Sequence, residues 1–137
     1  MSNDNNVEDA QHAEAKQVAD EQRMAAGLEF AHSLFAGMDI GPGANPDRLS
    51  ELSLRHLFGD LWQGEDLTKQ QRSLITCSML VALNRTEELL LHFTGAKNLG
   101  IPRETIEGLI THSAYYAGWP CAVGAAKSLQ QVWPKPE

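Results

Sequence analysis

Two features of the sequence predict an all-helical fold of about six helices. Apolar residues recur at helical spacing along nearly the whole chain, and no segment alternates apolar and polar residues over a useful length. The chain has 137 residues, of which 42% are hydrophobic, which suits one compact domain and is too short for two of typical size. We therefore expect a single helical domain over residues 8–133, after a disordered N-terminus at residues 1–7.

The first two helices are predicted on either side of a breaking segment. Residues 8–37 have the pattern of a long polar helix. The segment GMDIGPGANP then contains three glycines and two prolines, which disfavour a continuous helix. Asn45 as N-cap, with Pro46 at the first helical position, starts a second helix that Gly59 ends.

The third and fourth helices have clear signals at their ends. Thr68 and Gln71 form the pattern of a capping box at the start of the third helix. We expect this helix at the centre of the fold, because residues 74–83 are apolar on nearly every side. Thr86 is expected to cap the fourth helix, and Gly100 to terminate it.

The last two helices follow closely on one another. The fifth is expected from about Pro102 to Ala117, closed by Gly118. The sixth is expected to start at Pro120 and to reach about Trp133.

Charge and hydropathy exclude several classes of partner. Of the net charge of −7, residues 1–30 carry −5, from seven acids and two bases. An acidic chain with no cluster of Lys and Arg has no means of holding phosphates, so no nucleic acid is expected as a partner. The apolar runs are too short to span a bilayer, and the N-terminus lacks the pattern of a signal peptide. We expect a soluble cytoplasmic protein.

Two cysteines, Cys77 and Cys121, stand 44 residues apart without a C-x-x-C or a Cys/His metal spacing. A zinc site is therefore not expected. Isolated cysteines in a reducing compartment are most often small buried hydrophobes, which is the interpretation we favour. Reactive thiols or a mutual disulfide are the alternatives.

In the fourth helix, EELLLHFTGAKNLG, a histidine stands where an apolar residue would be expected. Leu89, Phe93 and Ala96 define its apolar face, and His92 falls at the edge of that face, with Glu88 one turn before it. A carboxylate at this spacing can hydrogen-bond an imidazole and raise its pKa, as a half-buried proton donor or acceptor requires. The alternative is a structural histidine that caps a backbone carbonyl or lies at an interface.

The fifth helix carries two further titratable groups. His112 lies at one edge of its apolar stripe beside Tyr116, whereas Glu107 lies at the opposite edge, about 140° away by the helical period. The two cannot easily converge on one small pocket from a single helix. For both side chains to act in one site, a second helix or a second subunit would have to contribute to it. The alternative is that Glu107 and His112 are each solvated residues without a role in catalysis.

Other candidates are an arginine and three tryptophans. Arg72 stands at the start of the most apolar helix, where a buried guanidinium requires a partner such as a carboxylate of the protein or of a substrate. Its alternative is a surface arginine in a first helical turn. Trp62, Trp119 and Trp133 could line a pocket, although packing in a core or an interface is the better default.

Three spaced motifs together resemble the carboxymuconolactone decarboxylase family, and within it the γ-carboxymuconolactone decarboxylases most. They are LTKQQRSLIT, EELLLHFTGAKNLG and ETIEGLITHSAYYAGWPCAVGAAK. Upstream, AAGLEF and FGDLWQGEDL resemble the family's N-terminal helix and its approach to the central helix, so the likeness spans about residues 20–133. It implies an all-helical subunit of the alkylhydroperoxidase D-like fold that associates into homotrimers or homohexamers, without metal or organic cofactor.

The function implied is decarboxylation of a carboxylated lactone or related keto acid in the catabolism of aromatic compounds, as in the β-ketoadipate pathway. Loss of carbon dioxide leaves an electron pair that can delocalise into the lactone, and an acid must then protonate carbon. The resemblance implies His92 as this acid and base, with Glu107 and His112 as further catalytic candidates. The candidates for substrate binding are Arg72, Glu88, Tyr116 and Trp119.

Two other functions are possible for this fold. Alkylhydroperoxidase D-like proteins reduce peroxides with a C-x-x-C pair followed by a histidine, and that motif is missing from this sequence. A thiol-dependent antioxidant protein is therefore the weaker enzyme hypothesis. A non-catalytic, oligomeric ligand-binding relative is the third.

Overall fold

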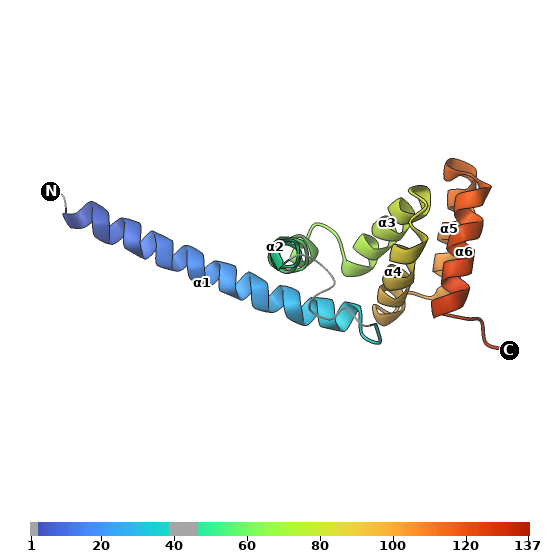
Figure 1. Ribbon diagram of the computed structural model, residues 1–137, viewed down its shortest axis with the longest axis horizontal. Helices are drawn as coiled ribbons and strands as arrows, with labels where there is room; N and C mark the ends of the chain where they lie inside the picture. The colour runs from blue at the N-terminus through green and yellow to red at the C-terminus, as the bar shows by residue number, and fades with distance from the viewer. Residues whose placement is uncertain (1–2, 39–46) are drawn as a thin grey trace. The chain divides into compact units, whose positions relative to one another are not determined.

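The computed structural model describes residues 3–38 and 47–137, and all regular structure within these ranges is helical (Figure 1), which confirms the predicted fold class. A π-helical turn, Ser53–Phe58, continues the second helix, and a short 3-10 turn follows at Leu61–Gln63. Within the described ranges, no helix combines the length and the apolar character needed to cross a bilayer. In the described parts of the chain, the six α-helices are α1 (Asn3–Leu34), α2 (Asp47–Leu52), α3 (Lys69–Ala82), α4 (Thr86–Asn98), α5 (Arg103–Ala117) and α6 (Trp119–Val132).

The chain divides into two compact units. One consists of residues 1–31 and 42–64, and the other of residues 32–41 and 65–137. The boundary in the N-terminal part falls within the last turn of α1. The assignment of residues 8–133 to a single domain stays a prediction.

In the first unit, two glycines allow α1 to lie directly against the π-helical turn. A Cβ atom on Gly27 would stand 1.8 Å from the carbonyl oxygen of Leu54. A Cβ atom on Gly59 would stand 2.1 Å from the carbonyl oxygen of Arg23. No side chain fits at either distance, so the contact between the two backbones depends on glycine at both positions.

An aromatic cluster completes the first unit. The ring of Phe30 lies 5.4 Å from that of Trp62 and 6.3 Å from that of Phe58, measured between centroids. Trp62 is buried, which agrees with its expected packing role. The AAGLEF and FGDLWQGEDL segments therefore contact one another through both their glycines and their aromatic rings.

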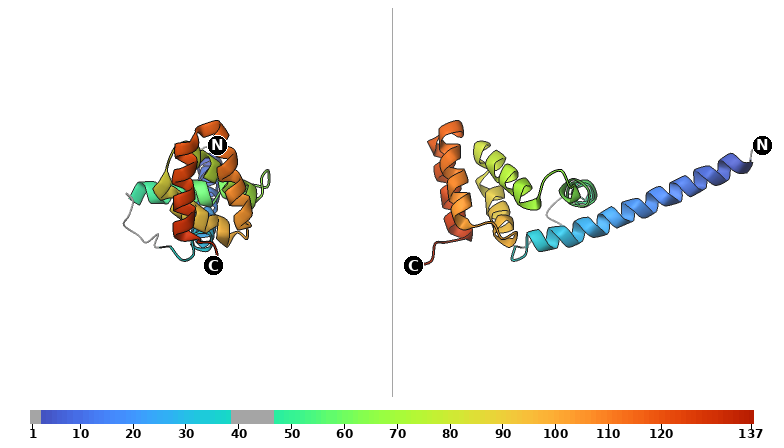
Figure 2. Two further views of the ribbon diagram at one scale, coloured as in Figure 1. Left: turned by 90° about the vertical axis from the view of Figure 1, so that its right-hand side faces the viewer. Right: turned by 180° about the vertical axis from the view of Figure 1, so that it is seen from behind.

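In the second unit, four helices pack around one core (Figure 2). Helix α3 lies beside α4 and α5, and α6 lies beside the same two helices. The core is made of residues from all four, because each turns an apolar stripe inward. Its buried members are Cys77, Val81, Leu89, Phe93, Ala96, Ile101, Ile106, Ile110, Ala114, Ala122, Ala125 and Leu129.

Local signals at several helix ends are confirmed. Thr68 accepts a hydrogen bond from the Gln71 amide, and the Gln71 side chain accepts one from the Thr68 amide, which is the expected capping box. Gly100 has φ of 76° after the end of α4. Its amide bonds to the carbonyl of Lys97, and the Ile101 amide to that of Ala96, which forms a Schellman motif. Pro102 and Gly118 flank α5 as expected.

Two predictions about helix starts are corrected. Helix α1 begins at Asn3, so the N-terminal segment is helical over residues 3–7, where no order was expected. Its polarity does not distinguish an exposed helix from unstructured chain, and an existing helix gains one hydrogen bond for each residue added. Thr86 is the first residue of α4 and not its cap, because the left-handed turn at Asn84 places Arg85 in the capping position. Asn45 and Pro46 lie outside the described residues.

The expectation that α3 is surrounded on all sides is wrong for one face. Ile75, Met79 and Leu83 follow one another at a spacing of four residues and are 42%, 60% and 68% exposed. The opposite face holds the buried Cys77 and Val81. Hydrophobicity alone could not distinguish the two faces, and α3 therefore leaves an apolar stripe uncovered in the subunit.

Replacing Gly27 with Ala is expected to destabilise the protein by roughly 1–3 kcal/mol or more, because the added methyl overlaps the Leu54 carbonyl. The matched control is Gly108→Ala on α5, where a Cβ would meet nothing within 4 Å. That variant should gain about 0.5–1 kcal/mol from higher helix propensity. Chemical denaturation measures both, and equal stabilities of the two variants would contradict the close contact.

Candidate functional site

His92 lies at the border between the core and the surface of α4. Leu89, Phe93 and Ala96 are completely buried, as the helical period predicts. His92, next to Phe93 in sequence, is consequently half-buried at the edge of this face. Helix α4 therefore places the imidazole partly against protein and leaves the rest of it exposed.

The segment that follows α1 crosses α4 beside His92. The side-chain amide of Asn98 donates hydrogen bonds to the carbonyl oxygens of Leu34 (2.8 Å) and Ala36 (3.0 Å). Between these two residues, the buried ring of Phe35 stands edge-on to the imidazole of His92, at 5.5 Å and 90°. This contact was not predicted from the sequence.

Burial and charge act on His92 in opposite directions. Desolvation lowers the pKa of His92 below its ordinary value of 6.5, and the negative charge of Glu88 partly opposes this by raising the pKa. The expected effect of Glu88, to raise the pKa of His92, is therefore present but is outweighed by burial. The sequence also allowed a hydrogen bond from the imidazole to Glu88. Among the described residues no hydrogen bond joins the two side chains, so this expectation is corrected. The imidazole is neutral at pH 7.

Cys77 lies on α3 directly against the backbone of His92. Its thiol donates a weak hydrogen bond to the His92 carbonyl oxygen, at 3.8 Å. Burial raises the pKa of the Cys77 thiol to about 12, although a hydrogen bond with Ser73 acts in the other direction. The thiol therefore stays protonated at neutral pH, and both cysteines are free, with Cys121 half-buried. This agrees with the interpretation of Cys77 as a small hydrophobe.

Arg72 has the carboxylate partner that its position required. Its guanidinium is buried and forms an ion pair with Asp66, whose own side chain is 76% exposed. Hydrogen bonds from Gln70 to Leu99 and from Cys77 to His92 show that α3 and α4 run antiparallel, with Cys77 level with His92. Arg72 is five residues from Cys77 along α3, a separation of about 7.5 Å along the helix axis.

Glu107 is held in an ion-pair cluster with the C-terminal segment. Arg103 bonds to it from the preceding turn, and Lys135 pairs with it at 3.0 Å. The hydrogen bond from Lys135, with a contribution from Arg103, holds the pKa of Glu107 below its ordinary value. Arg103 also donates to the carbonyl oxygen of Trp133 at 2.8 Å. Glu107 therefore binds the chain end to α5 and is ionised at neutral pH.

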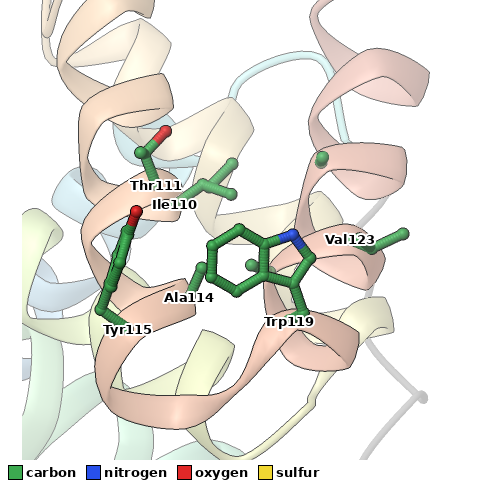
Figure 3. A pocket seen from close by; sticks show the side chains of 8 residues that line it. Ile110, Thr111, Ala114, Tyr115, Trp119 and Val123 are labelled. Carbon is green, nitrogen blue, oxygen red and sulfur yellow. The ribbon is translucent and has the colours of Figure 1, made fainter.

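The remaining candidates lie on α5 and at the start of α6. His112 and Tyr116 are both exposed and stack on one another, with ring centroids 4.8 Å apart. The rings of Tyr115 and Trp119 meet edge-on at 5.3 Å and flank an open, mainly apolar groove of about 240 Å³ (Figure 3). The groove is lined by Ile110, Thr111, Ala114, Tyr115, Trp119, Ala122, Val123 and Ala126.

The predicted site residues therefore form separate groups within the described parts of the chain. Glu88 acts on His92, and His112 contacts Tyr116, whereas Glu107 belongs to the C-terminal cluster. No hydrogen bond or ion pair between described residues joins His92 to Glu107 or His112. Across residues 3–38 and 47–137, no group of three His, Cys, Asp or Glu side chains is placed to hold a metal ion.

Comparison with known proteins identifies the family. Residues 47–131, more than half of the chain, match the model of the carboxymuconolactone decarboxylase family. The chain belongs to this family. The candidate site residues all lie within the matched range, whereas Phe35 lies before it.

Two relatives in this comparison are named decarboxylases. The chain is 30% identical over 120 residues to a 4-carboxymuconolactone decarboxylase of Acinetobacter baylyi, covering 83% of this chain and 89% of that protein. It is 35% identical over 75 residues to a nitrosuccinic acid decarboxylase of Metarhizium robertsii, covering 55% of this chain and 52% of that protein. These names support decarboxylation as the class of reaction in this member of the carboxymuconolactone decarboxylase family.

Phe35, Asn98 and Arg103 are the residues of these groups that sequence reasoning missed. Phe35 and Asn98 come from segments far apart in the chain, and neither residue type carries chemistry by itself. One signal was available at Gly95, a glycine inside α4, since such a glycine often marks a close approach. A Cβ there would stand 3.1 Å from the side chain of Leu34, next to Phe35.

Replacing Glu88 with Gln is expected to lower the pKa of His92 further, because it removes the charge that opposes desolvation. Titration of the imidazole by NMR measures this change. Glu87→Gln is the matched control, since it removes the same charge from the adjacent position on another side of α4 and should leave the pKa unchanged.

The sign of the pH dependence follows from the lowered pKa. Below pH 6.5 the unfolded chain binds a proton at His92 more readily than the folded protein, so stability falls as the pH drops toward the folded pKa. Glu88→Gln should extend this loss to lower pH. A His92 pKa that rises or stays constant in Glu88→Gln would contradict the assignment of the charge effect to Glu88.

Proposed function

We propose that this protein is a cofactor-independent decarboxylase that acts on a carboxylated lactone or a related keto acid, in the catabolism of aromatic compounds. The observation that carries the proposal is the half-buried imidazole of His92, kept neutral by burial beside Phe35 and accompanied by Glu88. The family membership and the two decarboxylase relatives support the class of reaction.

The two named substrates share a chemical requirement. In a carboxylated muconolactone, the electron pair left by carbon dioxide delocalises into the lactone as a dienolate. In nitrosuccinic acid, loss of the carboxylate beside the nitro group leaves a nitronate. Each reaction therefore needs an acceptor of electrons that the substrate itself contains, followed by delivery of a proton to carbon.

His92 is suited to supply that proton. An anionic substrate next to the imidazole favours its charged form, so binding raises the pKa that burial lowers in the free protein. The carbon–carbon bond to the carboxylate breaks, carbon dioxide leaves, and the imidazolium gives its proton to carbon. In the dienolate this is the carbon beside the lactone carbonyl, and in the nitronate it is the carbon that bore the carboxylate. Neutral His92 then takes up a proton from solvent, which balances the reaction.

Glu88 and Phe35 adjust this proton transfer. The Glu88 charge limits how far burial lowers the pKa of His92. The Phe35 ring covers one side of the imidazole, which limits access of water there. Glu107, His112, Arg72, Tyr116 and Trp119 lie in other groups, and we propose that those of them that contact substrate do so through association of subunits.

The self-association proposed here, as a homotrimer or homohexamer, would cover apolar surface that the subunit leaves open. Ile75, Met79 and Leu83 form an exposed stripe on α3. Tyr115 and Trp119 are 77% and 59% exposed around the groove. Exposed apolar surface of this kind is typical of protein interfaces.

A thiol-dependent peroxidase is not favoured. Such a mechanism requires a thiolate, and the Cys77 thiol is completely buried with its pKa raised to about 12. The Cys77 thiol also has the His92 carbonyl as its hydrogen-bond acceptor, and Cys121 is a separate free cysteine.

His92→Gln is expected to reduce kcat by about 10²–10⁴-fold, the usual contribution of a general acid. Release of carbon dioxide from 4-carboxymuconolactone and from nitrosuccinic acid measures the activity. In D2O, one deuteron should appear beside the lactone carbonyl in the product of 4-carboxymuconolactone, and at the carbon that lost the carboxylate in the product of nitrosuccinic acid. His12→Gln on exposed α1 is the matched control. Release of carbon dioxide from neither acid would contradict the proposal, and full turnover by His92→Gln would contradict the role of His92.

Met79→Lys is expected to weaken self-association at least tenfold, because it places a charge in the middle of the exposed stripe on α3. Light scattering at micromolar concentration measures the mass of the wild type and of the variant. Gln131→Lys, at an exposed polar position on α6, controls for the added charge. A monomeric wild type would contradict the proposed association.

A further inference from the structure

The amide of Asn98 joins α4 to the end of α1. Both of its hydrogen bonds go to backbone carbonyls, at 2.8 Å to Leu34 and 3.0 Å to Ala36. Leu34 is the last residue of α1, where carbonyl groups have no partner within the helix. A side chain of α4 therefore satisfies two acceptors that the end of α1 leaves open.

These two hydrogen bonds are made to the residues immediately before and after Phe35 in the chain. Because the carbonyls of its neighbours are held, the backbone of Phe35 has little freedom to turn. The ring is 4% exposed and is directed at the imidazole of His92. The position of the ring is therefore set by Asn98 as well as by packing.

His92, Gly95 and Asn98 follow one another at three-residue spacing on α4, so they share one side of the helix. Each of them contacts the segment Leu34–Ala36. Gly95 permits the close approach, since a Cβ there would lie 3.1 Å from Leu34 Cδ1 and 3.2 Å from Leu34 Cγ. The imidazole and the hydrogen bonds of Asn98 are thus the two ends of one continuous contact.

We propose that Asn98 is a positioning residue for His92, which acts by clamping Leu34–Ala36 so that the Phe35 ring fixes the imidazole and shields one of its sides from water. This inference rests on the proposed function, in which His92 moves the proton. Asn98 itself touches neither the imidazole nor the reacting atoms. Phe35 lies before residues 47–131, so the matched family segment does not contain this half of the contact.

The consequence for the chemistry comes through solvation. Desolvation is the largest influence on the pKa of His92, and the Phe35 ring is one of the groups that exclude water from it. Among the residues that the structure describes, Glu88 on the same helix is the charged group that acts on the imidazole, and the Cys77 thiol on α3, which contacts the His92 backbone, is neutral. Release of the clamp should therefore hydrate the imidazole and leave its charged neighbours unchanged.

The test uses Asn98→Ala in the full-length protein. NMR titration should show the pKa of His92 moving up toward 6.5, and the pH profile of kcat should shift in the same direction. Phe35→Leu, which keeps Asn98 but removes the ring, should reproduce both shifts and gives a second variant if Asn98→Ala folds poorly. The double variant should add little to either single change, because both act through the same contact.

Gln70→Ala is the matched control. Gln70 also donates a side-chain hydrogen bond to a backbone carbonyl at the same end of α4, that of Leu99 at 3.3 Å, but it does not touch Leu34–Ala36. This variant should leave the titration of His92 unchanged.

Two results would overturn the proposal. The first is an Asn98→Ala variant that loses stability while the titration of His92 stays as in the wild type. The second is a shift of equal size in Gln70→Ala. If the proposed decarboxylase function is wrong, the wild type releases no carbon dioxide. The NMR titration of His92 still tests the clamp in that case, so the two failures are distinguishable.

Discussion

Leu89, Phe93 and Ala96 are completely buried on one side of α4, and their burial fixes the rotation of that helix about its own axis. Once this rotation is set, the helical period decides the direction of every other residue on α4. His92 is turned to the border of the core, and Gly95 and Asn98 face the end of α1. A packing requirement of the four-helix unit is therefore also what directs the imidazole. Any change that rotates α4 would move the candidate site as a whole.

The environment of His92 combines two requirements that oppose each other. Shielding by protein lowers its pKa, which strengthens its electrostatic response to a bound anion but leaves it unprotonated in the free state. The Glu88 charge limits that loss without forming a hydrogen bond to the ring. An imidazole balanced in this way can gain a proton when an anionic substrate arrives and release it to carbon when the charge has been dispersed. Both steps depend on partial burial of the ring. A fully exposed imidazole would respond weakly to the charge of a bound anion, and a fully enclosed one would not take up the proton.

Local sequence signals predicted much of the fold, because the interactions they report are made within a few residues. The capping box at Thr68, the left-handed Gly100 and the buried face of α4 each depend on neighbours within two turns. Thr86 was wrongly predicted to cap α4, because the left-handed turn at Asn84 has no clear signal in the sequence. His92 could be selected from its position on the helix, but the direction of its pKa shift could not. That direction comes from burial of the ring by the folded chain. Part of that surrounding is Phe35, which comes from a segment far away in the sequence.

Three paired cations of the second unit bear on how a site in this unit would bind the carboxylate that leaves. Arg72 is paired with Asp66, and Arg103 and Lys135 are both paired with Glu107. A strong ion pair to the carboxylate that leaves would stabilise the substrate more than the transition state, because negative charge moves away from that carboxylate as carbon dioxide forms. Cations that are already paired with protein carboxylates bind the leaving carboxylate less strongly, so they stabilise the bound substrate less. A weakly charged surrounding with a single imidazole nearby is thus better suited to decarboxylation than a cluster of open guanidinium groups would be. In this arrangement, binding energy has to come from other parts of the substrate, where the charge does not change during the reaction.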